Sequence, residues 1–273
     1  PYIMRLMAGI GRPKDESFGV DFAGTVETVG SAVTEFKPGD NVFGTTGGAF
    51  GEYVVMRESR AVTHMPAPAD FEQAAGVPVA AVTALQALRD AGELKPGQQV
   101  LINGASGGVG TYAVQIARAI GAEVTAVNST RNVELVKSLG ADHVIDYKKE
   151  DYTELGRRYD LIIDNVGNHS LLANRKVMTE NAKLVIVGAP DGKWIGPLTR
   201  PLAAMLINPF ISQSFEMIMA RMKKEDLETL AAYMAAGQVH PVIDRHFPLA
   251  EVPDAIRYSE TGRARGKIII DVN

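Results

Sequence analysis

The stretch from residue 99 to about residue 146 constrains the fold of this chain more than any other. A short apolar strand at residues 100–102 is followed by the turn Gly104-Ala105-Ser106-Gly107-Gly108-Val109-Gly110. An amphipathic helix is expected over residues 108–119, and a second strand over residues 123–127. Strand, glycine-rich turn, helix and strand in this order predict a parallel βαβ unit.

The glycines of the turn have separate predicted roles. Gly107 would let the backbone approach a pyrophosphate, because a Cβ there would collide with the ligand. Gly110 would let the helix pack closely on the strand. The helix start would offer unpaired N–H groups and the positive end of its dipole to phosphates. We interpret the turn as a dinucleotide cradle, although Ala105 replaces the first glycine of the common pattern. A tight strand–helix turn without a ligand is the alternative.

The alternation continues beyond the cradle and predicts a doubly wound α/β sheet. Strands are expected at residues 143–146, 160–164 and 183–187, with a helix at 133–139. The first quarter looks β-rich, with apolar runs at 23–29, 41–44 and 51–55. The tail is expected to form a helix at 225–236, a strand at 242–247, a helix at 250–259 and a closing strand at 267–272. Residues 189–210 contain four prolines and would form either a connection over a cleft or an ordinary long crossover.

The end of the second strand indicates which cofactor the cradle would bind. A carboxylate at this point holds the ribose of NAD, but this chain continues Asn128-Ser129-Thr130-Arg131. Two hydroxyls and a guanidinium suit a 2′-phosphate. The sequence therefore predicts NADPH as the cofactor, with a solvated Arg131 in the first turn of a helix as the alternative.

Composition excludes several classes of function. The chain has no cysteine, which excludes disulfides, thiolate zinc sites, iron–sulfur clusters and a cysteine nucleophile. This fits a cytoplasmic location. The 28 basic and 32 acidic residues give a charge of −4, so no nucleic-acid or membrane-surface partner is expected. The sequence contains no stretch of about 18 uninterrupted apolar residues, so no membrane span is predicted.

Several segments together resemble a known family. They are Gly19-Val20-Asp21-Phe22-Ala23-Gly24, Val29-Gly30, Phe36-Lys37-Pro38-Gly39-Asp40-Asn41-Val42-Phe43-Gly44, Gly48-Ala49-Phe50-Gly51-Glu52-Tyr53-Val54, Thr83-Ala84, Leu139-Gly140-Ala141-Asp142 and Gly262-Arg263-Ala264-Arg265-Gly266-Lys267. In this order, over nearly the whole chain, they resemble the medium-chain dehydrogenase/reductase superfamily in its zinc-free quinone oxidoreductase branch.

The resemblance implies two domains. A GroES-like β-barrel domain would be formed by both chain ends, residues 1–78 and 238–273, with a Rossmann domain at 79–237 between them. The first barrel strands would precede Pro1, so we expect a fragment that lacks the family's N-terminal part. Members of this family often pair through the Rossmann domain, and the resemblance admits a homodimer.

No metal is expected. The zinc-dependent relatives carry Gly-His-Glu where this chain has Gly19-Val20-Asp21, and they use cysteine ligands. The five histidines, His64, His143, His169, His240 and His246, show no metal-ligand spacing in the sequence.

The resemblance also implies the cofactor contacts. Thr83 would lie near the nicotinamide, and Tyr147 near the adenosine. The pyrophosphate would meet Ser106, Gly107, Gly108 and Val109, and the 2′-phosphate would meet Ser129, Thr130 and Arg131. Asn165, Val166 and Gly167 would follow the fourth strand, Gly188 and Ala189 the fifth, and Phe210, Ile211 and Ser212 the sixth.

The expected reaction is hydride transfer from NADPH to a small molecule, a quinone or an α,β-unsaturated carbonyl. Without zinc, hydrogen-bond donors or water must stabilise the charge on the carbonyl oxygen. The catalytic candidates are Tyr53 and Tyr2, of which Tyr53 could equally pack in the barrel core. Asp21 and Glu52 are interpreted as structural acids, and Asp164 as the residue that ends its strand and fixes the following turn.

Two other functions remain open. An enoyl-thioester reductase would share the fold and the missing zinc, but no basic run for an acyl carrier is present. A non-catalytic NADPH-binding protein would keep the cradle alone. Oxidation of NADPH by quinones would distinguish a quinone reductase from a non-catalytic NADPH-binding protein.

Overall fold

The computed structural model describes residues 18–188 and 196–272, which form two compact units. The sheet unit is Thr83–Met219, and the terminal unit combines residues 18–82 with 220–272. The structure groups residues 220–237 with the terminal unit, whereas the sequence pattern groups them with the sheet. The reason is helix α8 (Lys224–Ala235), which packs against strand β3 (Val62–His64).

A six-stranded parallel sheet forms the centre of the sheet unit. Its strand order is β6-β5-β4-β7-β8-β9, as expected for a doubly wound fold. The central strands are buried on both faces because helices cover both. The strands are β4 (Gln99–Asn103), β5 (Glu123–Asn128), β6 (His143–Asp146), β7 (Tyr159–Asp164), β8 (Met178–Ile186) and β9 (Ser214–Met217).

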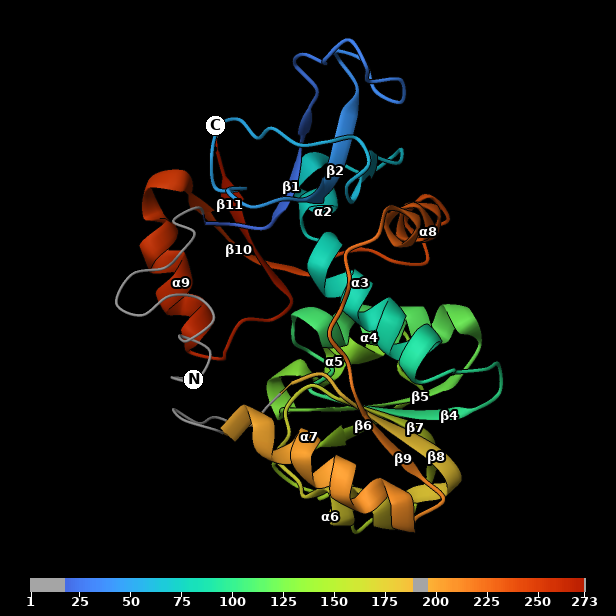
Figure 1. Cartoon of the computed structure of the whole chain (residues 1–273). Helices are drawn as coiled ribbons and strands as arrows, with labels where there is room; N and C mark the ends of the chain where they lie inside the picture. The colour runs from blue at the N-terminus through green and yellow to red at the C-terminus, as the bar shows by residue number, and fades with distance from the viewer. Residues whose placement is uncertain (1–17, 189–195, 273) are drawn as a thin grey trace. The chain divides into compact units, whose positions relative to one another are not determined.

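Helices lie on the two faces of this sheet. In Figure 1, α4 (Gly108–Ile120) and α5 (Val133–Ser138) cover one face, and α6 (Leu171–Lys176) and α7 (Gly196–Ile207) cover the other. Leu101, Ile162, Leu184 and Phe215 belong to the core on the second side. Helix α7 contains Pro201 and lies within the proline-rich segment. This segment therefore forms a crossover from β8 to its parallel neighbour β9, one of the two expectations, although the sequence pattern did not indicate its helix.

The carboxyl ends of the strands meet at one edge of the sheet, because all six run in parallel. Asn103, Asn128, Asp146 and Asp164 end β4, β5, β6 and β7 there. The chain passes from β4 to β5 and β6 on one side and then places β7 on the other side of β4. This reversal is the point where open α/β sheets bind ligands.

The terminal unit contains two small sheets. Strands β1 (Asp21–Thr25), β2 (Asn41–Thr45) and β3 are antiparallel, whereas β10 (Ile243–Pro248) and β11 (Lys267–Asp271) are parallel. The closing strand β11 pairs with β10 in the structure. A barrel formed by both chain ends predicts instead that this strand pairs with strands of the first quarter, and that prediction was wrong for the described residues. Strand β11 does stay out of the six-stranded sheet. The apolar run at 51–55 forms no strand in the structure.

Short helices complete both units. Asp70 caps α2 (Phe71–Ala75) by accepting a hydrogen bond from the Gln73 N–H at 2.8 Å, as an N-cap aspartate should. The remaining elements are α3 (Pro78–Gln86), the π-helical turn η1 (Ala87–Ala91), the 3₁₀ turns η2 (Thr130–Asn132), η3 (Asn208–Phe210) and η4 (Leu249–Glu251), and α9 (Val252–Glu260).

Candidate dinucleotide site at the carboxyl edge of the sheet

The glycine-rich turn leads from β4 directly into α4. Gly104 has φ +77°, a left-handed conformation that glycine adopts without strain. Gly107 is the extended N-cap of α4 and has no side chain to cap the helix. The N–H groups at the start of this helix therefore face outward from the strand-to-helix turn without a side-chain acceptor, as an anion-binding helix start requires.

Two glycines of the turn differ in what surrounds them. A Cβ on Gly110 would lie 2.2 Å from the Gly104 carbonyl oxygen, so close packing of helix and strand requires this glycine. A Cβ on Gly107 would come no closer than 3.5 Å to that same oxygen, and Gly107 has φ −83°, which any residue adopts. The protein itself therefore leaves room at Gly107, and a ligand that approaches the backbone explains why the residue is glycine.

The turn after β5 is fastened to the cradle by Asn132, which sequence reasoning missed. Its Nδ2 donates to Ser106 Oγ at 2.8 Å and lies 3.4 Å from Ser129 Oγ. The Oδ1 atoms of Asn132 and Asn128 are buried and accept no hydrogen bond from the described residues. Two predicted phosphate contacts, Ser106 and Ser129, thus belong to one polar cluster. In this cluster the Oδ1 atoms of Asn128 and Asn132 can still accept hydrogen bonds.

A carboxylate stands closer to this turn than the sequence indicated. Thr130 Oγ1 donates to Asp146 Oδ2 at 2.6 Å, because β5 and β6 are neighbours and Asn128 is in register with Asp146. This hydrogen bond lowers the pKa of Asp146 below its ordinary value of 3.8, so the group is charged at neutral pH. The end of β5 itself carries no acid, as the sequence shows, but the neighbouring strand β6 brings Asp146 beside it, which the sequence pattern did not indicate.

Arg131 and Tyr147 lie on the surface beside this carboxylate. Arg131 belongs to the turn η2 and is exposed, and Tyr147 follows β6 with 57% of its surface exposed. Lys149 Nζ lies 3.7 Å from Asp146 Oδ2. Tyr147 also lines a cavity of about 350 Å³ together with His169. Basic and acidic side chains thus lie together at this end of the site, because Lys148, Glu150 and Asp151 line the same cavity.

The turn after β7 is held by Asp164, as the sequence predicted. Its Oδ1 accepts hydrogen bonds from the N–H groups of Val166 at 3.2 Å and Gly167 at 2.9 Å. Gly188 packs so tightly on this turn that a Cβ would lie 1.9 Å from the Asn165 carbonyl oxygen. Asn165, Val166, Gly167 and Gly188 are therefore brought together beside the cradle.

Other predicted residues lie elsewhere. Phe210 and Ser212 precede β9 instead of following the last strand, and Ser212 Oγ donates to the Glu180 carbonyl oxygen at 2.6 Å. They lie at the amino edge of the sheet, opposite the cradle. Thr83 lies half-buried on α3. Tyr53 is 72% exposed, so it does not pack in a core. Tyr2 and Ala189 lie outside the described residues.

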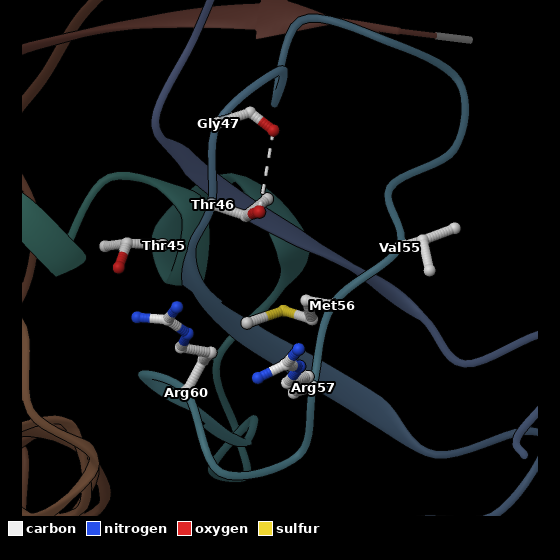
Figure 2. A pocket seen from close by; sticks show the side chains of 7 residues that line it. All are labelled: Thr45, Thr46, Gly47, Val55, Met56, Arg57 and Arg60. Carbon is white, nitrogen blue, oxygen red and sulfur yellow. Dashed lines mark hydrogen bonds between the residues drawn. The ribbon is translucent and has the colours of Figure 1, made fainter.

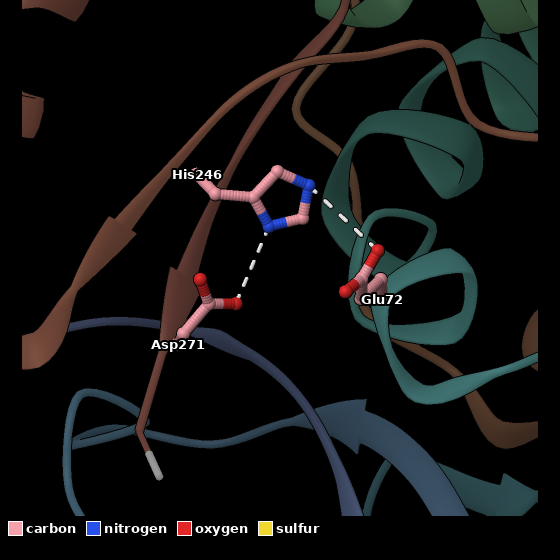
Figure 3. Close-up of side chains that lie close together, drawn as sticks. All are labelled: Glu72, His246 and Asp271. Carbon is pink, nitrogen blue, oxygen red and sulfur yellow. Dashed lines mark hydrogen bonds and ion pairs between the residues drawn. The ribbon is translucent and has the colours of Figure 1, made fainter.

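One cluster in the described part of the terminal unit could hold a metal ion. Figure 3 shows His246 between two carboxylates, with Nδ1 3.3 Å from Asp271 and Nε2 3.7 Å from Glu72. The three residues are far apart in the sequence, which explains why spacing did not reveal them. The two acids face different ring nitrogens, so no single ring nitrogen is shared by both carboxylates, which makes the three residues a poor ligand set for one ion.

A cavity of about 460 Å³ lies in the terminal unit (Figure 2). Arg57 and Arg60 line it together with Thr45, Thr46 and Met56. Both arginines are exposed. Their guanidinium groups and the two threonines make this cavity suitable for an anionic group.

A glycine cradle at the reversal point of a doubly wound sheet defines a Rossmann-type dinucleotide-binding protein. Family models agree: residues 139–270 match the zinc-binding dehydrogenase family and residues 4–67 the alcohol dehydrogenase GroES-like domain. The chain is 36% identical to a chloroplast envelope quinone oxidoreductase homolog of Arabidopsis thaliana, over 92% of this chain and 78% of the relative. It therefore belongs to the medium-chain dehydrogenase/reductase superfamily, in its quinone oxidoreductase-like branch.

Further similarities point the same way. An NADPH-dependent alkenal/one oxidoreductase from Arabidopsis chloroplasts is 34% identical over 92% of this chain and 63% of the relative. The quinone oxidoreductase structure from Coxiella burnetii matches with a TM-score of 0.81 and 28% identity, over 99% of this chain and 83% of that one. The chain is thus an oxidoreductase of a family that uses a nicotinamide cofactor. Because related proteins occur in chloroplasts and mitochondria, a cytoplasmic location stays a prediction.

In the part of the chain that the structure describes, none of the helices combines the length and the hydrophobicity that a membrane-spanning helix needs.

Proposed function

We propose that this protein reduces quinones or α,β-unsaturated carbonyl compounds with NADPH and without zinc. The observation that carries the proposal is the space at Gly107, where a Cβ meets nothing nearer than 3.5 Å. NADPH, when bound, supplies the hydride for the reaction. The names of the related quinone and alkenal/one oxidoreductases support the substrate class.

The residues of this chain would each hold one part of the cofactor. The start of α4, with Ser106, Gly107, Gly108 and Val109, would bind the diphosphate through backbone N–H groups. Ser129 and Arg131 would bind the 2′-phosphate, whereas the Thr130 hydroxyl already donates to Asp146. The turn after β7 and Gly188 would line the nicotinamide half, because they follow strands on the other side of β4.

Zinc-free chemistry is supported by the available ligands. The sequence contains no cysteine, and the described residues offer a single three-ligand group, around His246 in the terminal unit. A quinone or enone spreads the negative charge of reduction over its own conjugated system, so such substrates depend less on a metal than simple carbonyls do. Tyr53, being 72% exposed, and Tyr2 remain candidates for donating a hydrogen bond to the substrate oxygen.

The proposal is tested by measuring NADPH and NADH binding and NADPH oxidation with quinones, enones, aldehydes and enoyl-CoAs. We expect NADPH binding, and turnover with quinones or enones that a chelator does not reduce. Binding of NADPH without oxidation by any acceptor would instead indicate a non-catalytic binding protein. Failure to bind either cofactor would overturn the proposal altogether.

Enoyl-thioester reduction is a second candidate, favoured by the cavity in Figure 2. Arg57 and Arg60 are three positions apart and line the same cavity, so they could bind a phosphate of a coenzyme A or carrier group. The sequence alone showed no basic run there. If this candidate is correct, Arg57→Ala should raise KM for an enoyl-CoA and leave KM for a simple quinone unchanged.

We also propose that two copies pair through the edge of the sheet unit. Strand β9 ends the sheet, and an unpaired edge offers free N–H and C=O groups to another strand. The neighbouring α7 and η3 expose apolar side chains, with 58% of Leu202, 74% of Leu206 and 85% of Phe210 accessible. Sedimentation should detect a dimer, and Leu206→Glu should dissociate it.

A further inference from the structure

The carboxylate of Asp164 has two oxygens with different surroundings. The side chain is fully buried. Its Oδ1 accepts three hydrogen bonds, from Asn103 Nδ2 at 2.9 Å and from the N–H groups of Val166 and Gly167. Its Oδ2 accepts no hydrogen bond from the described residues and lies 2.7 Å from Arg200 Nη2.

Arg200 is an unusual neighbour for this oxygen. Its side chain is 91% buried, and among the described residues none accepts a hydrogen bond from its Nε, Nη1 or Nη2. The contact with Asp164 is therefore an ion pair between close charges without the paired hydrogen bonds of a bidentate contact. The arginine contributes a counter-charge that a fully buried carboxylate requires.

The pair connects two parts of the sheet unit. Asp164 ends β7, whereas Arg200 lies on α7, the helix that covers the face beside β9 and α6. Asn103, at the end of β4, joins the same cluster and also donates to Asn168 Oδ1 at 2.8 Å. The strand end next to the cradle, the turn after β7 and helix α7 thus share one buried polar centre.

We infer that Arg200 is a positioning residue for cofactor binding: it acts through Asp164 to shape the turn of Asn165, Val166 and Gly167. The inference rests on the proposed function, which assigns that turn to the nicotinamide half. Arg200 supplies the counter-charge beside Oδ2, which lets the Asp164 carboxylate stay buried where its Oδ1 accepts from both backbone N–H groups of the turn.

An apolar pair at positions 164 and 200 would not hold the turn of Asn165, Val166 and Gly167 in the same shape. Without an acceptor at residue 164, the N–H groups of Val166 and Gly167 would lose their partner in the interior, which is costly. The carboxylate supplies that acceptor, and the arginine makes its burial tolerable. The turn needs a buried acceptor to keep its shape, and this need explains why the ion pair of Asp164 and Arg200 lies in the interior.

The test compares Arg200→Met with Arg200→Lys, and with Asp164→Asn in the Arg200→Met background. The affinity for NADPH is measured by fluorescence titration at a temperature where circular dichroism shows each variant folded. Arg158→Met is the matched control, because Arg158 is exposed at the start of β7. KM for the quinone at saturating NADPH is measured alongside.

We expect Arg200→Met to weaken NADPH binding by about tenfold to a hundredfold, the scale of a displaced positioning group. KM for the quinone should stay near the parent value. Arg200→Lys should bind NADPH within about threefold of the parent, because lysine keeps the counter-charge. The double variant should recover most of the affinity, since a neutral asparagine still accepts from the turn.

Different results separate the possible failures. Parent-like NADPH affinity in Arg200→Met would overturn the inference and leave the proposed function intact. A double variant as weak as Arg200→Met would also overturn it, because Arg200 would then bind the ligand itself. If Arg200→Met does not fold, Arg200→Lys and the double variant decide in the same way. A parent that does not bind NADPH would overturn the proposed function first.

Discussion

Lys267 Nζ lies 3.2 Å from Asp21 Oδ2 and donates a hydrogen bond to it, across 246 positions of the sequence. The other oxygen of Asp21 accepts from the Val79 N–H at 3.0 Å. Both side chains are mostly buried, and burial raises the pKa of Asp21 above its ordinary value of 3.8 while Lys267 opposes that rise. The pair joins β1 to β11 inside the terminal unit, and Asp21 is a structural acid, as expected.

Removing the lysine should therefore destabilise the terminal unit. Lys267→Met leaves the Asp21 carboxylate without its counter-charge, and we expect a loss of about 2–3 kcal/mol in the free energy of unfolding by urea at pH 7. The loss should shrink at pH 3, because protonated Asp21 has no charge to leave unpaired. Lys137→Met, which breaks an exposed pair with Glu134, should cost less than about 0.5 kcal/mol. Equal effects of the two substitutions would contradict the role of Lys267.

The two cradle glycines should respond differently to a side chain. Gly107→Val should abolish measurable NADPH binding and cost at most about 1 kcal/mol of stability, since the protein leaves space there. Gly110→Ala should lower stability by about 1–3 kcal/mol, because its Cβ would meet the Gly104 carbonyl oxygen at 2.2 Å. Calorimetric titration and urea unfolding check both. A Gly107→Val protein that titrates NADPH like the parent would show that the turn is not the site.

Cofactor preference should depend on Arg131. A charge-assisted contact with the 2′-phosphate is worth about 1.5–3 kcal/mol, or roughly one to two decades of affinity. Because Arg131 is exposed, we expect Arg131→Ala to weaken NADPH binding by about tenfold, the lower end of that range. Binding of NADH should hardly change. Equal losses for both cofactors in competition titrations would mean that Arg131 supports the fold.

Asn128→Asp should shift the preference toward NADH, because the new acid would repel the phosphate and accept from the ribose hydroxyls. The structure also predicts that this substitution lowers the stability of the fold. Asn128 is buried and in register with Asp146, so two acids would lie on neighbouring strand ends. We therefore expect Asn128→Asp to lower the unfolding temperature at pH 7, and Asp146→Asn in the same chain to restore it. A shift in preference without any loss of stability would argue against this proximity.

The hydrogen bond from Thr130 to Asp146 should give a distinct pH dependence. The folded-state pKa of Asp146 lies below its ordinary value of 3.8, so the stabilisation is present above that pH and is lost as the pH falls through the folded-state pKa. Thr130→Val should be less stable than the parent at pH 7 and equal to it in strong acid. Thr229→Val removes a bond to the Glu225 carbonyl oxygen, which does not titrate, so its effect should not vary in this range.

Metal content can be predicted from the ligands. Elemental analysis should find zinc well below one atom per chain, and a chelator should leave NADPH oxidation unchanged. If added zinc binds weakly at the cluster of Glu72, His246 and Asp271, His246→Ala should remove that binding and keep the activity. Activity that is lost with chelator and restored by zinc would contradict the zinc-free proposal.

The order of elements in the sheet unit could be predicted because its signals are local. Strand β6 and the start of α4 fall where residues 143–146 and Gly108 indicated, and the alternation of apolar strands with helices gave the doubly wound topology. Helix α7 and strand β9 were missed because Pro201 masks the helical pattern and β9 is only four residues long. Tertiary packing overrides such weak local signals.

By itself, the sequence determined that the chain has a phosphate cradle, contains no cysteine and belongs among Rossmann-type proteins, because each of these depends on neighbouring residues or on composition. Only the tertiary structure decided which distant residues meet. Asp146 reaches Thr130 across two parallel strands, Arg200 reaches Asp164 from a helix, and Lys267 reaches Asp21 from the other end of the chain. Such pairs follow from strand register and helix packing, which a linear pattern does not contain.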